Sequence, residues 1–359
     1  MFIFVNRKHP SDDRPMSDRN PVTMKDIANE LGVSVATVSR ALKDSPRISE
    51  AQRERIKAYA RERNFSPNVL AETLRRSKTA SPKVIGVIVP QLTHYYFSSI
   101  LSGIAEQAAS NDYHILVAQS QEQFELEKKI CESFMTHRVC GVIVSQAKDT
   151  VNYDHFRRLI DAQIQLVFYD RICTGINASR VVVDDYQGAF NAVSYLIESG
   201  CKRIAYYGAT RGLEILKNRY NGYRDAILKH GMTVDDALTI PCETRADAEA
   251  LTPEVLSRED RPDAFFAVND DTAIGILYTA KRMGFRVPED VSICGYTDSV
   301  SAVACDPMLT TVEQRGRKVG EEAVNILLDH VEGRVPADRV EKRVVRTRLV
   351  VRGTTKYGE

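Results

Sequence analysis

Eight short, continuously apolar runs recur between residues 84 and 296, and they constrain the fold of this chain more than any other feature. The runs cover 84–90, 114–119, 141–145, 165–170, 180–185, 203–208, 264–270 and 291–296. Segments with helical patterning separate several of them. Continuous apolar strands that alternate with helices are typical of parallel sheets covered on both faces. The spread of the runs indicates two α/β halves rather than one sheet, although the pattern alone does not exclude a TIM barrel.

Polar or charged residues stand at or just beyond the ends of many of these runs. They are Ser145, Asp170, Asp184, Asn269, Asp270 and Asp298. Ligands of open α/β sheets bind outside the carboxyl ends of the strands. We therefore expect these residues to surround one cleft, while each of them could also be an ordinary loop residue or helix cap.

Residues 22–65 have the pattern of three short helices. Thr23 and Asp26 resemble a capping box at the start of the first helix, and Gly32 ends it. Ser34 can cap the second helix. A helix, a tight glycine turn and a second helix with a polar face predict a helix-turn-helix that reads the major groove of DNA.

The second and third helices of this region have separate patterns. In the second, Val35, Val38 and Leu42 are expected to face inward, although Val35 could also contact thymine methyl groups. Ser49 and Gln52 resemble a capping box that opens the third helix. The residues expected to contact DNA are Thr23, Ser34, Val35, Ala36, Thr37, Ser39 and Arg40.

The net charge of +1 hides an uneven distribution. The stretch from Val22 to Ala80 holds twelve Lys/Arg and seven Asp/Glu, so it carries +5 and the rest of the chain carries −4. A small basic head on an acidic body is typical of a head that meets phosphate.

Other features exclude several classes of protein. No apolar run approaches the ~18 residues that span a membrane, and the start lacks the pattern of a signal peptide, so we expect a cytoplasmic protein without a membrane partner. The seven cysteines form no metal-binding spacing, which predicts reduced core residues and no metal. No cofactor motif or catalytic motif is present, so we expect no cofactor and no enzyme.

Several stretches, in this order, are similar to the lac repressor family (LacI/GalR). "DIANELGVSVATVSRAL" resembles its helix-turn-helix and "NFSPNVLAETLR" its hinge. The likeness continues through "VIGVIVP", "YDR", "VVVDD", "NDDTAIG", "VPEDVSICGYTD" and "PMLTTVEQ". It implies a small all-α head and an α/β body with two doubly wound parallel-sheet subdomains, like periplasmic binding proteins.

With this resemblance the chain divides into four parts. We expect a disordered tail (1–21), a DNA-binding head (22–66), a hinge helix and linker (67–82) and a ligand-binding and dimerisation body (83–355). Within the body, the expected N-subdomain covers about 83–181 and 311–331, and the expected C-subdomain about 182–310 and 332–355.

The resemblance also implies particular contacts. A homodimer would bind a pseudo-palindromic operator, with the hinge leucine Leu74 as a wedge between base steps. Asn68 and Ala71 would lie beside it, and Arg75 would add phosphate contacts. In the body, a small sugar or sugar derivative would bind between the subdomains. The residues expected to line its site are Tyr95, Tyr96, Phe97, Asp170, Arg219, Asn269, Asp270 and Asp298.

One position departs from the family pattern. Relatives often carry an acidic residue directly after the Gly-Tyr of "ICGYTD", where this chain has Thr297 followed by Asp298. Either Asp298 takes over the contact or the ligand needs no carboxylate there. We expect a ligand-responsive transcriptional repressor; the alternatives are a cytoplasmic sugar-binding receptor without DNA-binding activity and an enzyme on a doubly wound sheet.

Overall fold

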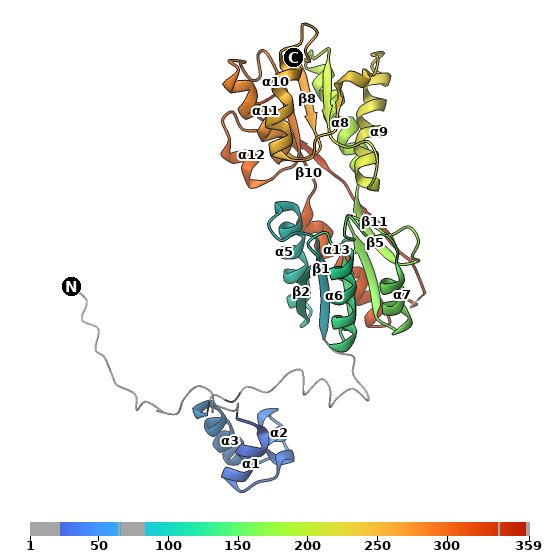
Figure 1. Cartoon of the computed structure of the whole chain (residues 1–359). Coiled ribbons are helices and arrows are strands. Elements are labelled where there is room, and N and C mark those ends of the chain that lie inside the picture. The colour runs from blue at the N-terminus through green and yellow to red at the C-terminus, as the bar shows by residue number, and fades with distance from the viewer. Residues whose placement is uncertain (1–21, 64, 66–82, 337, 357–359) are drawn as a thin grey trace, which may run out of the picture. The chain divides into compact units, whose positions relative to one another are not determined.

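The computed structural model describes residues 22–63, 65, 83–336 and 338–356. The chain divides into two compact units, Met1–Ala80 and Ser81–Glu359, called the head and the body below. Figure 1 shows the elements of each unit.

The described residues of the head form three helices around a small apolar core. They are α1 (Met24–Leu31), α2 (Val35–Leu42) and α3 (Glu50–Glu62). Ile27, Val38 and Ile56, one from each helix, are at most 1% exposed, and they hold the three helices together.

The helix caps of the head follow the sequence at Thr23, Ser34 and Gly32 and differ at Ser49. Thr23 and Asp26 form the predicted capping box, and Gly32 ends α1 with a φ of 68°, a value that favours glycine. Ser49 begins α3 without a capping bond from its side chain, so the second capping box is wrong. The inward placement of Val35 is also wrong. It is 39% exposed because it lies in the first turn of α2, ahead of the inner face that Val38 provides.

The body contains two six-stranded sheets. The first has the order β11-β5-β4-β3-β1-β2 and the second β12-β10-β9-β8-β6-β7. The strands of the first are β1 (Val84–Val89), β2 (His114–Gln119), β3 (Gly141–Val144), β4 (Gln165–Tyr169), β5 (Ser179–Val183) and β11 (Lys342–Val345). Those of the second are β6 (Ile204–Tyr207), β7 (Thr239–Ile240), β8 (Ala264–Ala267), β9 (Ser292–Thr297), β10 (Thr310–Glu313) and β12 (Arg348–Val350). All neighbouring strands are parallel except the antiparallel pair β10 and β12.

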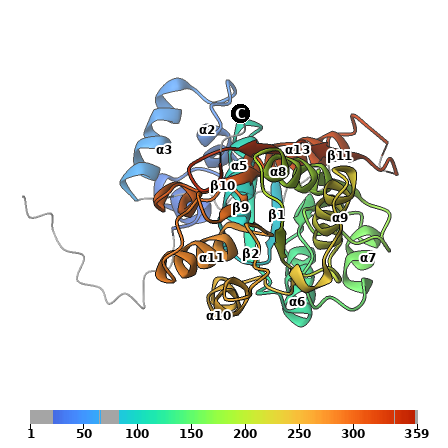
Figure 2. The ribbon, with the colours of Figure 1, turned by 90° about the horizontal axis from the view of Figure 1, so that it is seen from above.

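Helices cover both faces of each sheet, as the apolar runs predicted. In the N-subdomain, one core packs against α5 (Tyr95–Ser110) and α13 (Gly316–Val331), and the other against α6 (Phe124–Thr136) and α7 (Asp154–Asp161). In the C-subdomain, α8 (Asp185–Glu198) and α9 (Glu214–Lys229) cover one face, and α10 (Arg245–Leu256) and α11 (Asp270–Arg282) the other (Figures 1 and 2). The short helices η2 (Asp236–Leu238) and α12 (Val300–Ala304) complete the C-subdomain. The predicted fold class is thus confirmed.

The chain crosses between the two sheets three times, after β5, after β10 and after β11. The subdomain bounds expected from the sequence differ from these crossings. Residues 182–183 and 342–345 lie in the first sheet, and residues 311–313 lie in the second. The reason is that a strand belongs to the sheet with which it forms backbone hydrogen bonds, and this pairing is not encoded in the strand's own pattern.

Two further properties bear on the function. No helix in the described ranges is long and apolar enough to cross a membrane. All seven cysteines are free; six are buried and Cys305 is partly exposed.

Candidate functional site

The first turn of α2 presents a small exposed surface on the head. Val35 and Ala36 are exposed there, and Arg40 is exposed one turn further on. The hydroxyl of Ser34 accepts a hydrogen bond from the Thr37 backbone amide at 3.1 Å, so this serine also holds the helix start. The same arrangement leaves the apolar and basic groups of α2 free to meet the edges of bases.

The other residues predicted to contact DNA do not all belong to this exposed surface. Thr23 is exposed and caps α1, whereas Ser39 is half-buried. The hinge residues Asn68, Ala71, Leu74 and Arg75 lie outside the described residues.

In the body, Asp170 lies at the carboxyl end of β4. Its side chain is almost completely buried, and its backbone has a φ of 56°, in the left-handed region that aspartate tolerates better than most residues. One carboxylate oxygen has no hydrogen-bond partner among the described residues, and the other lies 4.0 Å from Nε of Arg171. Burial raises the pKa of Asp170 to about 6, so the group is a carboxylate at neutral pH that still has room to accept hydrogen bonds.

Arg219 of α9 is buried and held from three sides. Its Nε donates to the Asp185 carboxylate at 2.8 Å, and its Nη1 donates to the Val268 carbonyl at 2.6 Å. The guanidinium also lies over the ring of Tyr296, 3.9 Å from its centre. Two nitrogens of the Arg219 guanidinium, Nε and Nη1, therefore already donate hydrogen bonds within the protein.

Aromatic side chains at the start of α5 lie close to Asp170 and Arg219. Tyr96 and Phe97 are both 4% exposed. The Tyr96 hydroxyl has no partner in the described chain, and burial, together with the nearby Asp170 and Asp185, raises its pKa. Burial lowers the pKa of His94, which is therefore neutral at pH 7.

Unpartnered polar atoms gather at the carboxyl edge of the first sheet. Where β2, β3 and β4 end, single oxygens of Ser120, Ser145, Gln146 and Asp170 are buried without a hydrogen-bond partner in the described ranges. Buried polar groups are normally paired in folded proteins. Such a group of unpaired oxygens, beside two buried aromatic rings, is typical of a site that a polar ligand completes.

The remaining predicted ligand residues of the C-subdomain are already engaged. Asn269 caps α11 by accepting from the Thr272 amide and donates to the Glu243 carbonyl, both at 2.8 Å. Asp270 is buried, and its two oxygens accept from the Ser299 amide and the Thr311 hydroxyl.

Asp298 and Tyr95 lie apart from the unpartnered polar atoms around Asp170. Asp298 forms an ion pair with Arg352 at 2.7 Å. Tyr95 is 41% exposed, and together with Asp298 and Thr297 it lines a separate cavity of about 270 Å³. Asp298 therefore already has a cationic partner within the protein.

A cavity of about 540 Å³ opens between the subdomains beside Asp170. It is bounded by residues along β5 and β11 and by the starts of α8 and α9; Asp184, Asp185, Glu214 and Asn218 lie on its C-subdomain side. This volume is within the range of small-molecule sites.

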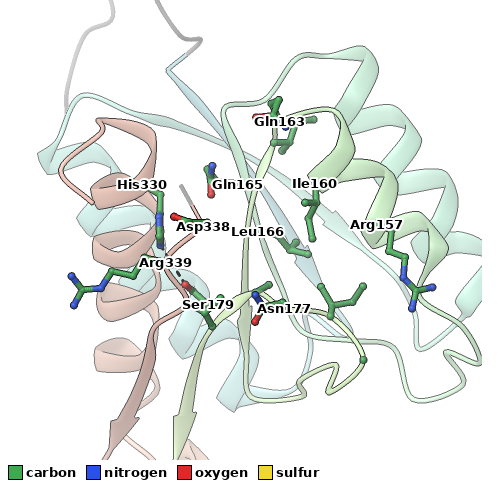
Figure 3. A pocket seen from close by; sticks show the side chains of 15 residues that line it. Arg157, Ile160, Gln163, Gln165, Leu166, Asn177, Ser179, His330, Asp338 and Arg339 are labelled. Atoms are coloured by element: carbon green, nitrogen blue, oxygen red, sulfur yellow. Dashed lines mark hydrogen bonds between the residues drawn. The ribbon is translucent and has the colours of Figure 1, made fainter. Parts of the chain in front are cut away.

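A third cavity, of about 500 Å³, lies at the opposite, amino-end edge of the first sheet (Figure 3). It is lined by Gln165 and Ser179, where β4 and β5 begin, and by His330 of α13. None of the residues predicted from the sequence lines it. No group of three or more metal-ligating side chains occurs in the described chain.

The sequence pattern missed two residues of the cleft. The pattern points to Asp184 rather than to its neighbour Asp185, and it places Tyr296 only within a strand. The "VVVDD" motif contains both aspartates, but which of the two is buried depends on where α8 begins.

A helix-turn-helix head on a two-subdomain body with an inter-subdomain cleft defines the class of ligand-responsive, DNA-binding regulators. Residues 23–68 match the family described as bacterial regulatory proteins, lacI family, and residues 193–355 match the periplasmic binding protein-like domain. The chain is 31% identical over 337 residues to the HTH-type transcriptional repressor CytR of Escherichia coli strain K12. This alignment covers 93% of this chain and 96% of the relative. The chain belongs to the lacI family of transcriptional regulators.

Other relatives and solved structures agree. The repressor PurR of Vibrio atlanticus is 28% identical over 93% of this chain and 98% of its own. The CelR–cellobiose complex has a TM-score of 0.69 at 26% identity, covering 93% of this chain and 99% of that one. The lac repressor dimer bound to operator and an anti-inducer has a TM-score of 0.80 at 24% identity, covering 94% and 99%, and shows the shared fold.

Proposed function

We propose that the protein represses transcription as a homodimer on a pseudo-palindromic operator, and that a small, hydroxyl-rich molecule in the inter-subdomain cleft controls this binding. The observation that carries the proposal is the group of unpaired polar atoms around Asp170 in the body of a chain with a helix-turn-helix head. The names of the relatives, which are repressors, support it.

DNA binding rests on α2. Its exposed Val35 and Ala36 can contact thymine methyl groups, and Arg40 can pair with a guanine edge or a phosphate. The predicted hinge contacts of Asn68, Ala71, Leu74 and Arg75 extend this proposal into the minor groove.

Dimerisation is supported by an apolar surface on the C-subdomain. Five large apolar side chains there are 37–64% exposed: Tyr278, Met283, Val300, Val303 and Met308. They belong to α11, to α12 and to the chain just beyond each helix. A surface of this kind is typical of an interface, and a second copy would place two heads on one operator.

Control by the effector follows from linkage. A molecule bound between the subdomains changes operator affinity only by the difference between its affinities for the DNA-bound and free conformations, typically ~1–3 kcal/mol. An inducer and a corepressor differ only in the sign of this difference.

The test is selection of genomic DNA fragments by the purified full chain, repeated with a panel of sugars and nucleosides. We expect a palindromic sequence whose recovery one compound changes. Arg40→Ala should weaken binding to it by about tenfold or more, in line with the ~1–3 kcal/mol of a base contact. Arg61→Ala is the matched control, because Arg61 is an exposed arginine of the same head that lies on α3 and pairs with Glu54.

Each other outcome points to a different function. If no DNA is enriched while the body still binds a sugar, the protein is a sugar receptor without DNA-binding activity. Turnover of a bound compound would instead indicate an enzyme.

A further inference from the structure

The third cavity, at the amino-end edge of the first sheet, is not used by the proposed function. Its volume of about 500 Å³ is within the range of small-molecule sites. Figure 3 shows the side chains that line it, which come from α7, from the starts of β4 and β5, and from the chain between His330 and Val340. Because β4 spans five residues, the cavity lies about 16 Å from Asp170, at ~3.3 Å per residue. It is therefore separate from the cleft.

Part of the cavity lining is apolar. Ile164, Leu166, Ile176 and Ala178 line it, and they belong to the core that packs against α6 and α7. Ile160 of α7 lines it too and is 37% exposed. Apolar surface that faces water gains free energy when a ligand covers it. The lining therefore favours a ligand with an apolar body.

Ser179 and His330 bring one unpaired polar atom to this lining. The two side chains are 3% and 8% exposed. The Ser179 hydroxyl accepts from the Glu341 amide at 3.0 Å and lies 3.3 Å from Nε2 of His330. Nδ1 of His330 is buried without a hydrogen-bond partner among the residues that the structure describes. In the neutral ring Nδ1 donates if Nε2 accepts from Ser179, and accepts if Nε2 donates, so either tautomer leaves one bond for a ligand to make.

Three carboxamides add groups that both donate and accept hydrogen bonds. Gln163 and Asn177 are exposed, Gln165 is half-buried, and all three line the cavity. A carboxamide is matched by a group that also carries a donor beside an acceptor, as another amide or a lactam does. The polar part of the lining therefore favours a ligand with such an edge.

The charges around the cavity have both signs. Arg157 pairs with Asp154 at 2.7 Å, and Nε of Arg339 lies 3.8 Å from the Glu341 carboxylate. Asp338 adds a carboxylate to the lining. A charged ligand would meet like and opposite charges together and would lose part of its water. An uncharged ligand avoids this cost.

From these contacts we propose that the cavity is a second small-molecule site, which takes an uncharged compound with an apolar body and an amide or lactam edge that bonds to Nδ1 of His330. Its position bears on the head. Because β1 and β4 both pair in parallel with β3, their first residues lie on one edge of the sheet. Lys83, through which the chain from the head enters the body, precedes β1 and lies on this edge, whereas Asp170 lies on the opposite one.

The first experiment compares three compounds that share one ring: benzamide, benzoate and benzylamine. Isotope labelling of the histidine rings of the full chain reports on Nδ1, and His330→Gln identifies the His330 resonance among those of the seven histidines. We expect benzamide to shift this resonance with a Kd of about 1 mM or tighter, and the two charged compounds to bind at least about threefold more weakly. Absence of a saturable shift with benzamide, or tighter binding of either charged compound, would overturn the proposal.

The second experiment changes the lining. His330→Phe keeps an aromatic ring but removes both nitrogens, so benzamide binding, followed through the ligand's own resonances, should weaken by about tenfold. His114→Phe is the matched control, because His114 is an exposed histidine that begins β2 at the same edge of the sheet. If His330→Phe does not fold, Asn177→Ala serves instead, since Asn177 is exposed and should weaken binding several-fold at an unchanged melting temperature. Unaltered binding in the folded lining variant would refute the site.

A last variant separates this site from the cleft. Asp170→Asn should leave benzamide binding unchanged, because Asp170 lies at the other end of β4. A loss as large as that of His330→Phe would place benzamide in the cleft and contradict the proposal. None of these measurements needs operator DNA, so failure of the repressor function would leave the test of this site intact.

Discussion

The two walls of the inter-subdomain cleft differ in how their buried carboxylates are paired. On the N-subdomain wall, buried oxygens of Ser120, Ser145 and Asp170 lack hydrogen-bond partners in the described residues. On the C-subdomain wall, the charged groups are paired within the protein, as in the ion pair of Arg219 with Asp185 and the two bonds to Asp270.

This difference separates groups that can bind a ligand from groups that stabilise the fold. Removing one partner of a buried ion pair destabilises the fold, because the other charge is left buried without compensation. Unpaired buried oxygens do not stabilise the free protein, because no bond offsets the cost of removing them from water, and they can gain bonds when a ligand arrives. We therefore expect substitutions on the C-subdomain wall to affect stability first and substitutions on the N-subdomain wall to affect ligand binding first.

The largest expected effect is that of Arg219→Ala. The substitution leaves the Asp185 carboxylate buried and unpaired, so the free energy of unfolding of the body should fall by about 3–5 kcal/mol. Urea denaturation followed by circular dichroism measures it. The double variant Asp185→Asn/Arg219→Met, which removes both charges, should lose less stability. If Arg219→Ala is as stable as the original chain, the difference between the two walls is refuted.

A smaller loss is expected for Asp270→Ala. The Ser299 amide and the Thr311 hydroxyl would lose their acceptor, at about 1–3 kcal/mol for an unsatisfied buried group. Asp271→Ala is the control, because Asp271 is an exposed carboxylate in the same first turn of α11. Equal losses in the two variants would mean that helix-terminal charge, and not the buried bonds, matters.

Asn269→Ala tests the cap of α11. Loss of the bond to the Thr272 amide should reduce stability by ~1 kcal/mol. Asn269→Asp keeps the accepting oxygen but loses the donor to Glu243, so thermal denaturation should place it between the alanine variant and the unaltered chain. If Asn269→Ala is as stable as the unaltered chain, the cap contributes nothing to stability here.

The smallest effect on stability is expected on the opposite wall. Ser145→Ala removes an unpaired hydroxyl and should change the free energy of unfolding by less than about 0.5 kcal/mol, while weakening effector binding several-fold. Ser179→Ala is the matched control at the other edge of the same sheet. Ser179 accepts from the Glu341 amide at 3.0 Å, so its loss should lower stability by about 1 kcal/mol and leave effector binding unchanged. The reverse result would refute the division between the two walls.

Much of the fold was predictable because its signals are local. Each of the eight predicted apolar runs overlaps a strand, and seven of these strands begin within one residue and end within two of the predicted run. The strands that the pattern missed are β7, β10, β11 and β12. Two of them, "KRVV" and "RLV", are short and carry charged residues, and they lie at the edge of a sheet. An edge strand buries less surface, so it needs no continuous apolar run.

The site was predictable only in part. Polar residues at strand ends led to Asp170, and the resemblance led to Tyr96, Phe97 and Arg219, which the structure brings together. Asp270 and Asp298 follow strands in the same way, but their carboxylates are engaged by distant residues. A strand-end carboxylate has the same local sequence context whether a ligand or the protein satisfies it.

The sequence by itself determined the helix-turn-helix, the two α/β halves and the membership of the chain in its family, because periodicity, caps and motifs are written in neighbouring residues. Only the tertiary structure decided which sheet takes each strand after a crossing, that Asp185 rather than Asp184 pairs with Arg219, and which polar groups of the cleft remain free. These outcomes depend on contacts between residues far apart in the chain, where burial and pairing select one partner for each charge.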